Sequence, residues 1–473
     1  MTASTHTWLF AMALVAVTAA PGLMVAALCT LQRRCAAASL AGDTGGNVTS
    51  SAPGTYGIDR ELTRKAAHVG TGLVCLTFPW LFAETWPVLA WSGATTAALL
   101  AIRWIPALQR VMGGGIYVDR ISLGEMYFPI SIGVMFWLAH GEWLLYLIPV
   151  LTLTVADAVG AVVGVRYGLH RYKTQEGEKS FEGSLAFFSV AFLTTHVPLL
   201  LFSPVGRAEC LLIGVVVGLI IMLVEAISWR GLDNLFIPVG TFYILQLYIH
   251  LSAAELVIQL VVLTSLALLS IVCRNRTTLS DNALMAASLS AFGLWALGAW
   301  PYLVSPLLLF VMHIFLPTFS SGLRPMLNLY AVSRVVCGAY LHLFVALAVG
   351  LEHGWLPFHL CLACSTGNMV AARLRVVQRE MSLGRVVWTA WLTTWIAFAP
   401  AVPLMLSSAA WPVALVMMAA GLWASIALFA RYWSPVEPRV QDQARQWVVE
   451  SVIAPVAACT GWIPALMLWF QNT

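Results

Sequence analysis

Residues 154–184, TVADAVGAVVGVRYGLHRYKTQEGEKSFEGS, hold the densest group of charged side chains in a chain that is otherwise strongly apolar. The stretch begins as an apolar helix with one acid, Asp157, and ends in a charged loop that leads into another apolar segment. A carboxylate inside a membrane span costs at least about 2.5 kcal/mol at the bilayer centre. We therefore expect Asp157 to pair with a base, bind a cation or face a wet cavity.

The composition outside this stretch is that of a membrane protein. Of the 473 residues, 60% are hydrophobic and 10% are charged, whereas about a quarter of the residues in a soluble protein are charged. Apolar runs of about 20 residues, the length that crosses a bilayer, recur along almost the whole chain. The predicted fold class is therefore all-α, a polytopic helical membrane bundle with about sixteen transmembrane helices.

The distribution of basic residues predicts how this bundle is oriented. Spans are predicted near residues 8–30, 67–83, 87–102, 126–139, 143–165, 185–202, 209–228, 235–251, 255–273, 283–299, 302–317, 335–350, 356–372, 386–405, 411–430 and 448–469. With successive loops on alternate sides, all of the 25 Lys and Arg residues except Arg207 fall on one side. The positive-inside rule makes that side cytoplasmic, with both termini opposite. We expect an integral protein of a bacterial plasma membrane or the endoplasmic reticulum.

Three regions are predicted along the chain. Residues 1–59 form an N-terminal transmembrane anchor followed by a flexible linker rich in Ala, Gly, Ser and Thr. Residues 60–273 form a membrane domain that carries the charged motifs, and residues 274–473 form a second membrane domain of uncertain function.

Polar clusters on the predicted cytoplasmic side suggest a site for a phosphorylated substrate. Arg64, Lys65 and His68 open a span, either as a topological anchor or as a cationic cluster for a phosphate. Lys179 and Glu182 stand at the start of another helix, where backbone N–H groups favour anions.

One further pair of polar residues allows two interpretations. Asp233 and Asn234 either cap the helix that follows or offer oxygen ligands to Mg²⁺. Gly160, Gly164 and Gly168 are spaced four apart and predict a close helix-packing seam. Cations for phosphate, separated acids for magnesium and a membrane setting together favour phosphoryl or nucleotidyl transfer to a lipid.

A membrane transporter whose buried acid couples ions is the alternative from another functional class. The clustering of the acids on one side, without a clear inverted repeat of broken helices, argues against a transporter.

Four motifs, in this order, resemble the polyprenol kinase family. That family includes dolichol kinase, phytol kinase and a CTP-dependent diacylglycerol kinase, and it is related to the CDP-diacylglycerol synthases. The motifs are RKAAH at 64–68, ADA at 156–158 with Gly160, Gly164 and Gly168, EKSFEGS at 178–184, and Glu225 with DNL at 233–235 and Pro238. The resemblance covers about residues 60–273 and implies Mg²⁺-dependent transfer of the γ-phosphate of a nucleoside triphosphate, commonly CTP, to a membrane-buried alcohol.

The resemblance, together with the chemistry of the side chains, gives three sets of expected site residues. The expected catalytic residues are Asp157, Lys179 and Glu182. The expected nucleotide-binding residues are Arg64, Lys65, His68, Gly160, Gly164, Lys179, Ser180 and Gly183. The expected metal ligands are Asp157, Glu182, Asp233 and Asn234. The expected partners are a lipid alcohol, a nucleoside triphosphate and the bilayer, without nucleic acid.

The position of the motifs bears on the acceptor. They lie in the first half of the chain, an arrangement more similar to phytol kinases than to eukaryotic dolichol kinases, which carry them toward the C-terminus. An isoprenoid alcohol such as phytol or dolichol is the expected acceptor. Diacylglycerol kinase and CDP-lipid-forming cytidylyltransferase activities are the enzymatic alternatives.

The second half carries a weaker resemblance. Residues 280–301 resemble, weakly, the membrane family of phytyl-phosphate kinases, which add a second phosphate. The later acidic motif of that family is missing here, because the acids after Asp281 are Glu352, Glu380, Glu437, Asp442 and Glu450. A noncatalytic second domain is therefore favoured.

Overall fold

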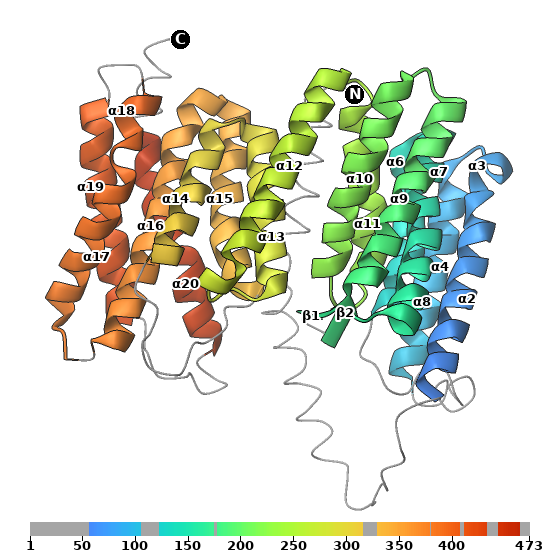
Figure 1. The fold of residues 1–473 in the computed structure, drawn as a ribbon, viewed down its shortest axis with the longest axis horizontal. Helices are drawn as coiled ribbons and strands as arrows, with labels where there is room; N and C mark the ends of the chain where they lie inside the picture. Colours follow the sequence, from blue (N-terminus) through green and yellow to red (C-terminus); the bar gives the residue numbers. More distant parts are fainter. Residues whose placement is uncertain are drawn as a thin grey trace, which may run out of the picture. The chain divides into compact units, whose positions relative to one another are not determined.

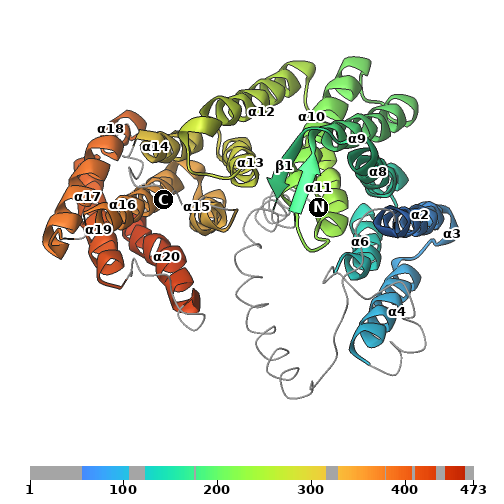
Figure 2. The ribbon, with the colours of Figure 1, turned by 60° about the horizontal axis from the view of Figure 1, so that its bottom comes forward.

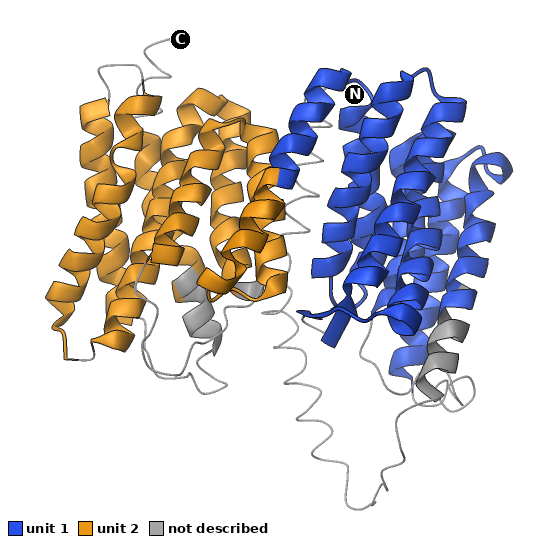
Figure 3. Cartoon of the chain, in the orientation of Figure 1, with its two compact units in different colours: residues 1–17, 36–264 blue, residues 18–35, 265–473 orange. Residues whose placement is uncertain are grey.

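The computed structural model describes residues 56–105, 123–174, 177–315, 329–378, 380–406, 411–432 and 443–463. The first predicted span and most of the linker after it lie outside these residues. The chain divides into two compact units, whose boundary lies between Thr264 and Ser265 (Figure 3). The predicted domain boundary at residues 273 and 274 stays a prediction.

Unit 1 contains the motif-bearing helices and one hairpin (Figure 1). Its elements are α2 (Tyr56–Leu76), α3 (Phe78–Leu81), α4 (Thr85–Trp104), α6 (Gly124–Ala139), α7 (Trp143–Leu151), the π-helical turn η1 (Thr152–Ala156), α8 (Asp157–Tyr167), β1 (Arg171–Thr174), β2 (Gly177–Ser180), α9 (Phe181–Phe202), α10 (Arg207–Ile227), α11 (Asp233–Tyr248) and most of α12 (Ala253–Cys273).

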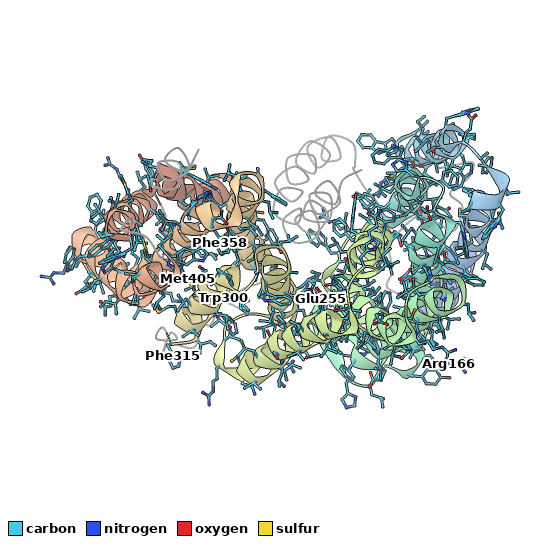
Figure 4. All side chains as sticks on the ribbon, turned by 90° about the horizontal axis from the view of Figure 1, so that it is seen from above. Arg166, Glu255, Trp300, Phe315, Phe358 and Met405 are labelled. Atoms are coloured by element: carbon cyan, nitrogen blue, oxygen red, sulfur yellow. The ribbon has the colours of Figure 1, made fainter. Side chains whose placement is uncertain are left out.

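Unit 2 is helical throughout its described residues. Its elements are the end of α12, η2 (Arg274–Arg276), α13 (Asp281–Gly298), α14 (Pro301–Phe315), α15 (Leu329–Val349), α16 (Leu351–Val377), α17 (Leu383–Phe398), α18 (Ala401–Met405), α19 (Trp411–Tyr432), α20 (Gln443–Ala458) and η3 (Cys459–Gly461). Helix α16 packs against α14, α15, α17, α19 and α20 and is the core of the unit. Phe358 of α16 is fully buried, whereas Phe315 at the end of α14 is exposed (Figure 4).

The observed elements agree with the predicted fold class, a helical membrane bundle. Within the described residues, nine helices are long and apolar enough to cross a membrane, and four shorter apolar helices accompany them. Every predicted span after the first overlaps a helix. The count of about sixteen crossings stays a prediction. Large apolar side chains such as Trp86, Ile271 and Val272 are exposed, which suits helices surrounded by lipid and not by water.

The charged loop predicted after the Asp157 helix contains a hairpin that the sequence analysis did not predict. Strands β1 and β2 pair antiparallel with Tyr172 opposite Lys179 and Thr174 opposite Gly177. Alternating exposed and half-buried side chains in β1 fit a strand with one covered face. At the turn Gly177 has φ of +133°, a conformation that residues with a Cβ rarely adopt.

The predicted glycine seam is confirmed where α8 crosses α9. A Cβ on Gly183 would lie 2.8 Å from Gly164 Cα and 2.9 Å from the Gly160 carbonyl oxygen, both of them backbone atoms. A Cβ on Gly168 would lie 2.6 Å from the Ser180 side chain. The glycines therefore let two helix backbones meet directly and fix where Ser180 and Lys179 lie relative to α8.

The close crossing predicts the effect of Gly183→Ala. Because backbone cannot move aside as a side chain does, we expect the variant to lose about 1–3 kcal/mol of stability. The matched control is Gly93→Ala in α4, where a Cβ would meet nothing within 4 Å and alanine gains up to about 1 kcal/mol of helix propensity. Thermal unfolding of both variants in detergent tests this; equal midpoints would contradict it.

Candidate active site

Two motifs of unit 1, at residues 178–184 and 225–238, meet beside the hairpin. The hairpin lies at one end of the helical bundle (Figures 1 and 2). Here α6, α9 and α11 begin and α10 ends. The Leu123 amide donates to the Arg230 carbonyl, and Asn234 Nδ2 donates to the Gly124 carbonyl at 2.8 Å. We call this end, formed by residues 123–125, 171–174, 177–180 and 225–234, the hairpin face. It brings together segments that lie up to 110 residues apart in the sequence.

A lysine and two acids form the first charged cluster of this face. Lys179 Nζ, on β2, donates to Glu225 Oε1 at 2.7 Å and also to the Glu225 backbone carbonyl. The side chains of Lys179 and Glu225 are 28% and 16% exposed. Burial lowers the pKa of Lys179, but the charges of Glu225 and Asp233 outweigh burial, and the pKa is raised above its usual value. The ammonium group is therefore protonated at neutral pH.

Asp233 is the acid in this cluster with spare bonding capacity. Its Oδ1 atom is buried and has no hydrogen-bond partner. A buried carboxylate oxygen without a donor is costly, and a bound cation would satisfy it. The neighbouring Asn234 is buried and uses its amide to hold α6.

A buried ion pair forms the second cluster, between α2 and α8. Lys65 Nζ lies 2.6 Å from Asp157 Oδ2, and the two side chains are 7% and 8% exposed. His68 Nε2 lies 3.7 Å from the same carboxylate oxygen and 3.3 Å from the Leu153 carbonyl oxygen. Of the three alternatives that the sequence left open for Asp157, a base, a cation or a wet cavity, the structure shows pairing with a base. A charge pair buried this deeply costs desolvation energy that hydrophobic residues would avoid, which favours a functional role.

The helix is irregular immediately before Asp157. The π-helical turn η1 separates α7 from α8, and Pro149 lies one turn before it. Such turns are frequent at functional sites. The sequence analysis treated residues 143–165 as one regular span, since a π turn has no distinct apolar period.

Glu182 is placed differently from Asp157. Its carboxylate accepts from the backbone amides of Leu169 and His170 and pairs with His170 Nδ1 at 2.6 Å. In this structure it therefore fastens the turn between α8 and β1, and it is not brought together with Asp157. Its predicted role as a metal ligand stays a prediction.

Ser180 and the glycines have structural contacts that sequence reasoning only partly expected. Ser180 Oγ accepts from the Gly183 amide and caps α9. Gly160, Gly164 and Gly183 form the seam between α8 and α9, and their contact with a nucleotide stays a prediction. Arg64 lies in α2, but its side chain is outside the described residues.

Two hairpin-face residues were absent from the predicted set. Glu225 lies in a matched motif but was given no role, although an acid near the end of an apolar helix is itself a signal. Tyr172 on β1 bonds Ser184 Oγ at 2.8 Å through its hydroxyl and stands opposite Lys179. No sequence pattern identified it, because only strand pairing places it there.

The described residues hold no group of three or more His, Cys, Asp or Glu side chains placed to bind a metal ion. This is compatible with Mg²⁺, which is commonly bound by one or two carboxylates together with substrate phosphates. Among the described residues, Asp233 Oδ1 is a buried carboxylate oxygen without a hydrogen-bond partner, and its predicted role as a metal ligand stays a prediction.

Comparison with curated proteins identifies the family. The chain is 31% identical over 190 residues to a phytol kinase of Synechocystis, an alignment that covers 38% of this chain and 76% of that protein. The chain belongs to the phytol kinase family. It is also 23% identical over 201 residues to a probable chloroplastic phytol kinase 2 of Glycine max, covering 40% of this chain and 65% of that protein. No family model and no solved structure matches.

The phytol kinase family assignment confirms the resemblance drawn from the four motifs. It applies to part of the chain, since the longer of the two alignments covers 40% of it.

Proposed function

We propose that this protein is a membrane lipid kinase that transfers the γ-phosphate of CTP, or of another nucleoside triphosphate, to an isoprenoid alcohol such as phytol. The observation that carries the proposal is the Lys179, Glu225 and Asp233 cluster at the hairpin face of a phytol kinase family member. A protonated lysine beside acids with a free oxygen suits a triphosphate with its metal ion.

The reaction requires mainly that the two substrates are positioned and that the negative charge of the phosphates is neutralised. The bond between the γ-phosphorus and the β–γ bridging oxygen breaks, and the nucleoside diphosphate leaves with that oxygen. A bond from the γ-phosphorus to the alcohol oxygen forms, and the hydroxyl proton passes to the released diphosphate or to water. Negative charge spreads over the phosphoryl oxygens in the transition state, so cations and N–H donors stabilise it. Lys179 supplies a cation, and the N-termini of α6, α9 and α11 at the hairpin face add partial positive charge.

Lys179 must change partners for this role. In this structure its ammonium is held by Glu225. An incoming triphosphate carries more negative charge than a single carboxylate, and we propose that it takes the lysine and releases Glu225 toward the metal ion. Charge-assisted hydrogen bonds between lysine and phosphate oxygens are among the stronger ones in proteins.

Magnesium is part of the proposal. The residue that would hold it is Asp233, through its unpartnered oxygen, with Asn234 and the released Glu225 as further oxygen donors. Asp157 and Glu182, the other predicted ligands, pair with Lys65 and His170 in this structure, and each would have to leave that partner to reach the ion. The ion would neutralise charge on the β- and γ-phosphates. Lys65 holds Asp157 in place.

The proposed acceptor is an alcohol whose hydrocarbon tail stays in the bilayer, beside the lipid-exposed helices. Phytol is favoured over dolichol by the N-terminal position of the motifs and by the names of the relatives. We further propose that the hairpin face is cytoplasmic, because it carries Lys173, Lys179 and Arg230, whereas Arg207 begins α10 at the opposite end.

A label-transfer assay with purified protein in lipid tests the function. CTP or ATP labelled in the γ-phosphate is offered with phytol, farnesol, dolichol or diacylglycerol, with and without Mg²⁺. We expect labelled phytyl or prenyl phosphate from CTP in the presence of Mg²⁺ and none after EDTA. In a parallel assay with CTP labelled in the cytidine, label in the lipid would identify a cytidylyltransferase. In the γ-phosphate assay, label in diacylglycerol alone would identify a diacylglycerol kinase. Substrate flux across vesicles without nucleotide consumption would replace the proposal with a transporter.

A further inference from the structure

The π-helical turn before Asp157 raises a structural question, because it interrupts an otherwise continuous helix between α7 and α8. A π turn holds one residue more than the α-helix it replaces. One residue corresponds to about 100° of rotation around an α-helix. The turn therefore sets the direction in which Asp157 leaves its helix.

Neighbouring elements hold the turn through specific contacts. Thr152 Oγ1 lies 2.9 Å from Thr194 Oγ1 of α9. Gly72 of α2 packs so closely on Thr154 that a Cβ there would lie 2.3 Å from Thr154 Oγ1. His68 Nε2 lies 3.3 Å from the Leu153 carbonyl oxygen.

The contact with His68 joins α2 to the backbone of the turn. A carbonyl oxygen only accepts, so the Nε2 atom of His68 carries the hydrogen. A side chain can hydrogen-bond to the backbone at such a turn because the regular helical hydrogen-bond pattern is interrupted there. The imidazole is 11% exposed and packs edge-on against Phe128 at 4.8 Å. It therefore offers little surface to a phosphate.

We propose that His68 is a positioning residue: through the Leu153 carbonyl it holds the π turn in the shape that directs Asp157 to Lys65. This assignment rests on the proposed lipid kinase function and differs from the expectation that His68 binds the nucleotide. Lys65 and His68 are three positions apart on α2, so one helix face carries both the ionic partner of Asp157 and the donor to the turn.

The test compares His68→Leu with His68→Gln. Glutamine places an amide N–H near the position of Nε2, whereas leucine keeps bulk without a donor. For His68→Leu we expect kcat to fall about 100-fold, because a misplaced reactive group slows turnover. KM for CTP should change by no more than about twofold, because the contacts that bind CTP in the ground state are kept. His68→Gln should restore most of kcat. A rise in KM for CTP at unchanged kcat, or equal loss in both variants, would overturn the assignment.

Deletion of Val155 provides a test that does not depend on how well a His68 variant folds. Val155 is the half-buried residue in a turn whose other residues are buried. Its removal should turn η1 into an α-helical turn with the flanking helices kept in phase. We expect a folded protein with kcat reduced about 100-fold; wild-type turnover would overturn the proposal. The wild-type protein in the same assay tests the kinase function separately from the role of His68. If the wild-type protein does not label lipid, the kinase function itself is rejected.

Discussion

Asp157→Asn is expected to reduce lipid phosphorylation at least about 100-fold, because it removes a charge that preorganises the site. It also leaves Lys65 buried without its counter-charge, which costs about 3–5 kcal/mol of stability. The measurement is label transfer to phytol from γ-labelled CTP, together with thermal unfolding of the same sample. Near-normal activity would remove Asp157 from the proposed site.

The double variant Lys65→Met/Asp157→Asn separates the catalytic role from the structural one. Removing both members of a buried pair restores much of the stability that the loss of one partner costs. We expect the double variant to unfold at a higher temperature than Asp157→Asn and to remain inactive. Recovery of activity with stability would show that the pair only holds α2 against α8.

Lys179→Met is the second substitution with a large expected effect. Loss of the ammonium removes the cation that we propose binds the triphosphate, and we expect kcat/KM for CTP to fall about 100-fold or more. The matched control is Lys173→Met on β1 of the same hairpin, an exposed residue that pairs with Glu178 across the strands. Its activity should stay close to wild type. Equal loss in both variants would indicate a general effect of hairpin charge.

The raised pKa of Lys179 predicts the pH dependence of this effect. A lysine with a raised pKa is fully charged below its ordinary value, and its contribution is lost only as pH rises through the raised value. The activity ratio of wild type to Lys179→Met should therefore be constant between about pH 6 and 9. A ratio that changes within this range would contradict a permanently charged lysine.

Much of the fold could be predicted from the sequence, because membrane helices have a local signal. A run of about 20 apolar residues has few alternatives to a spanning helix in lipid. The glycine spacing at 160, 164 and 168 likewise predicted the α8–α9 seam. The hairpin was missed, since its strands have four residues each and lie in a charged segment without an apolar pattern.

The candidate site was predicted in part. The motifs identified Lys65, Asp157 and Lys179 as chemically important, and the structure places each beside an opposite charge. The sequence did not predict which lysine forms an ion pair with which acid. It also grouped Glu182 with the metal ligands, whereas its carboxylate here holds the His170 turn. Partner choice depends on helix crossing and strand register, which are not local properties.

The sequence by itself indicated a helical membrane protein that resembles the polyprenol kinase family, because composition, apolar length and short motifs are local features of the chain. Only the tertiary structure decided what surrounds residues 154–184. Packing of α2 gives Asp157 its lysine, the hairpin carries Lys179 to Glu225, and a π turn sets the direction of the acid. These three outcomes depend on contacts between residues 46 to 92 positions apart, which no local pattern specifies.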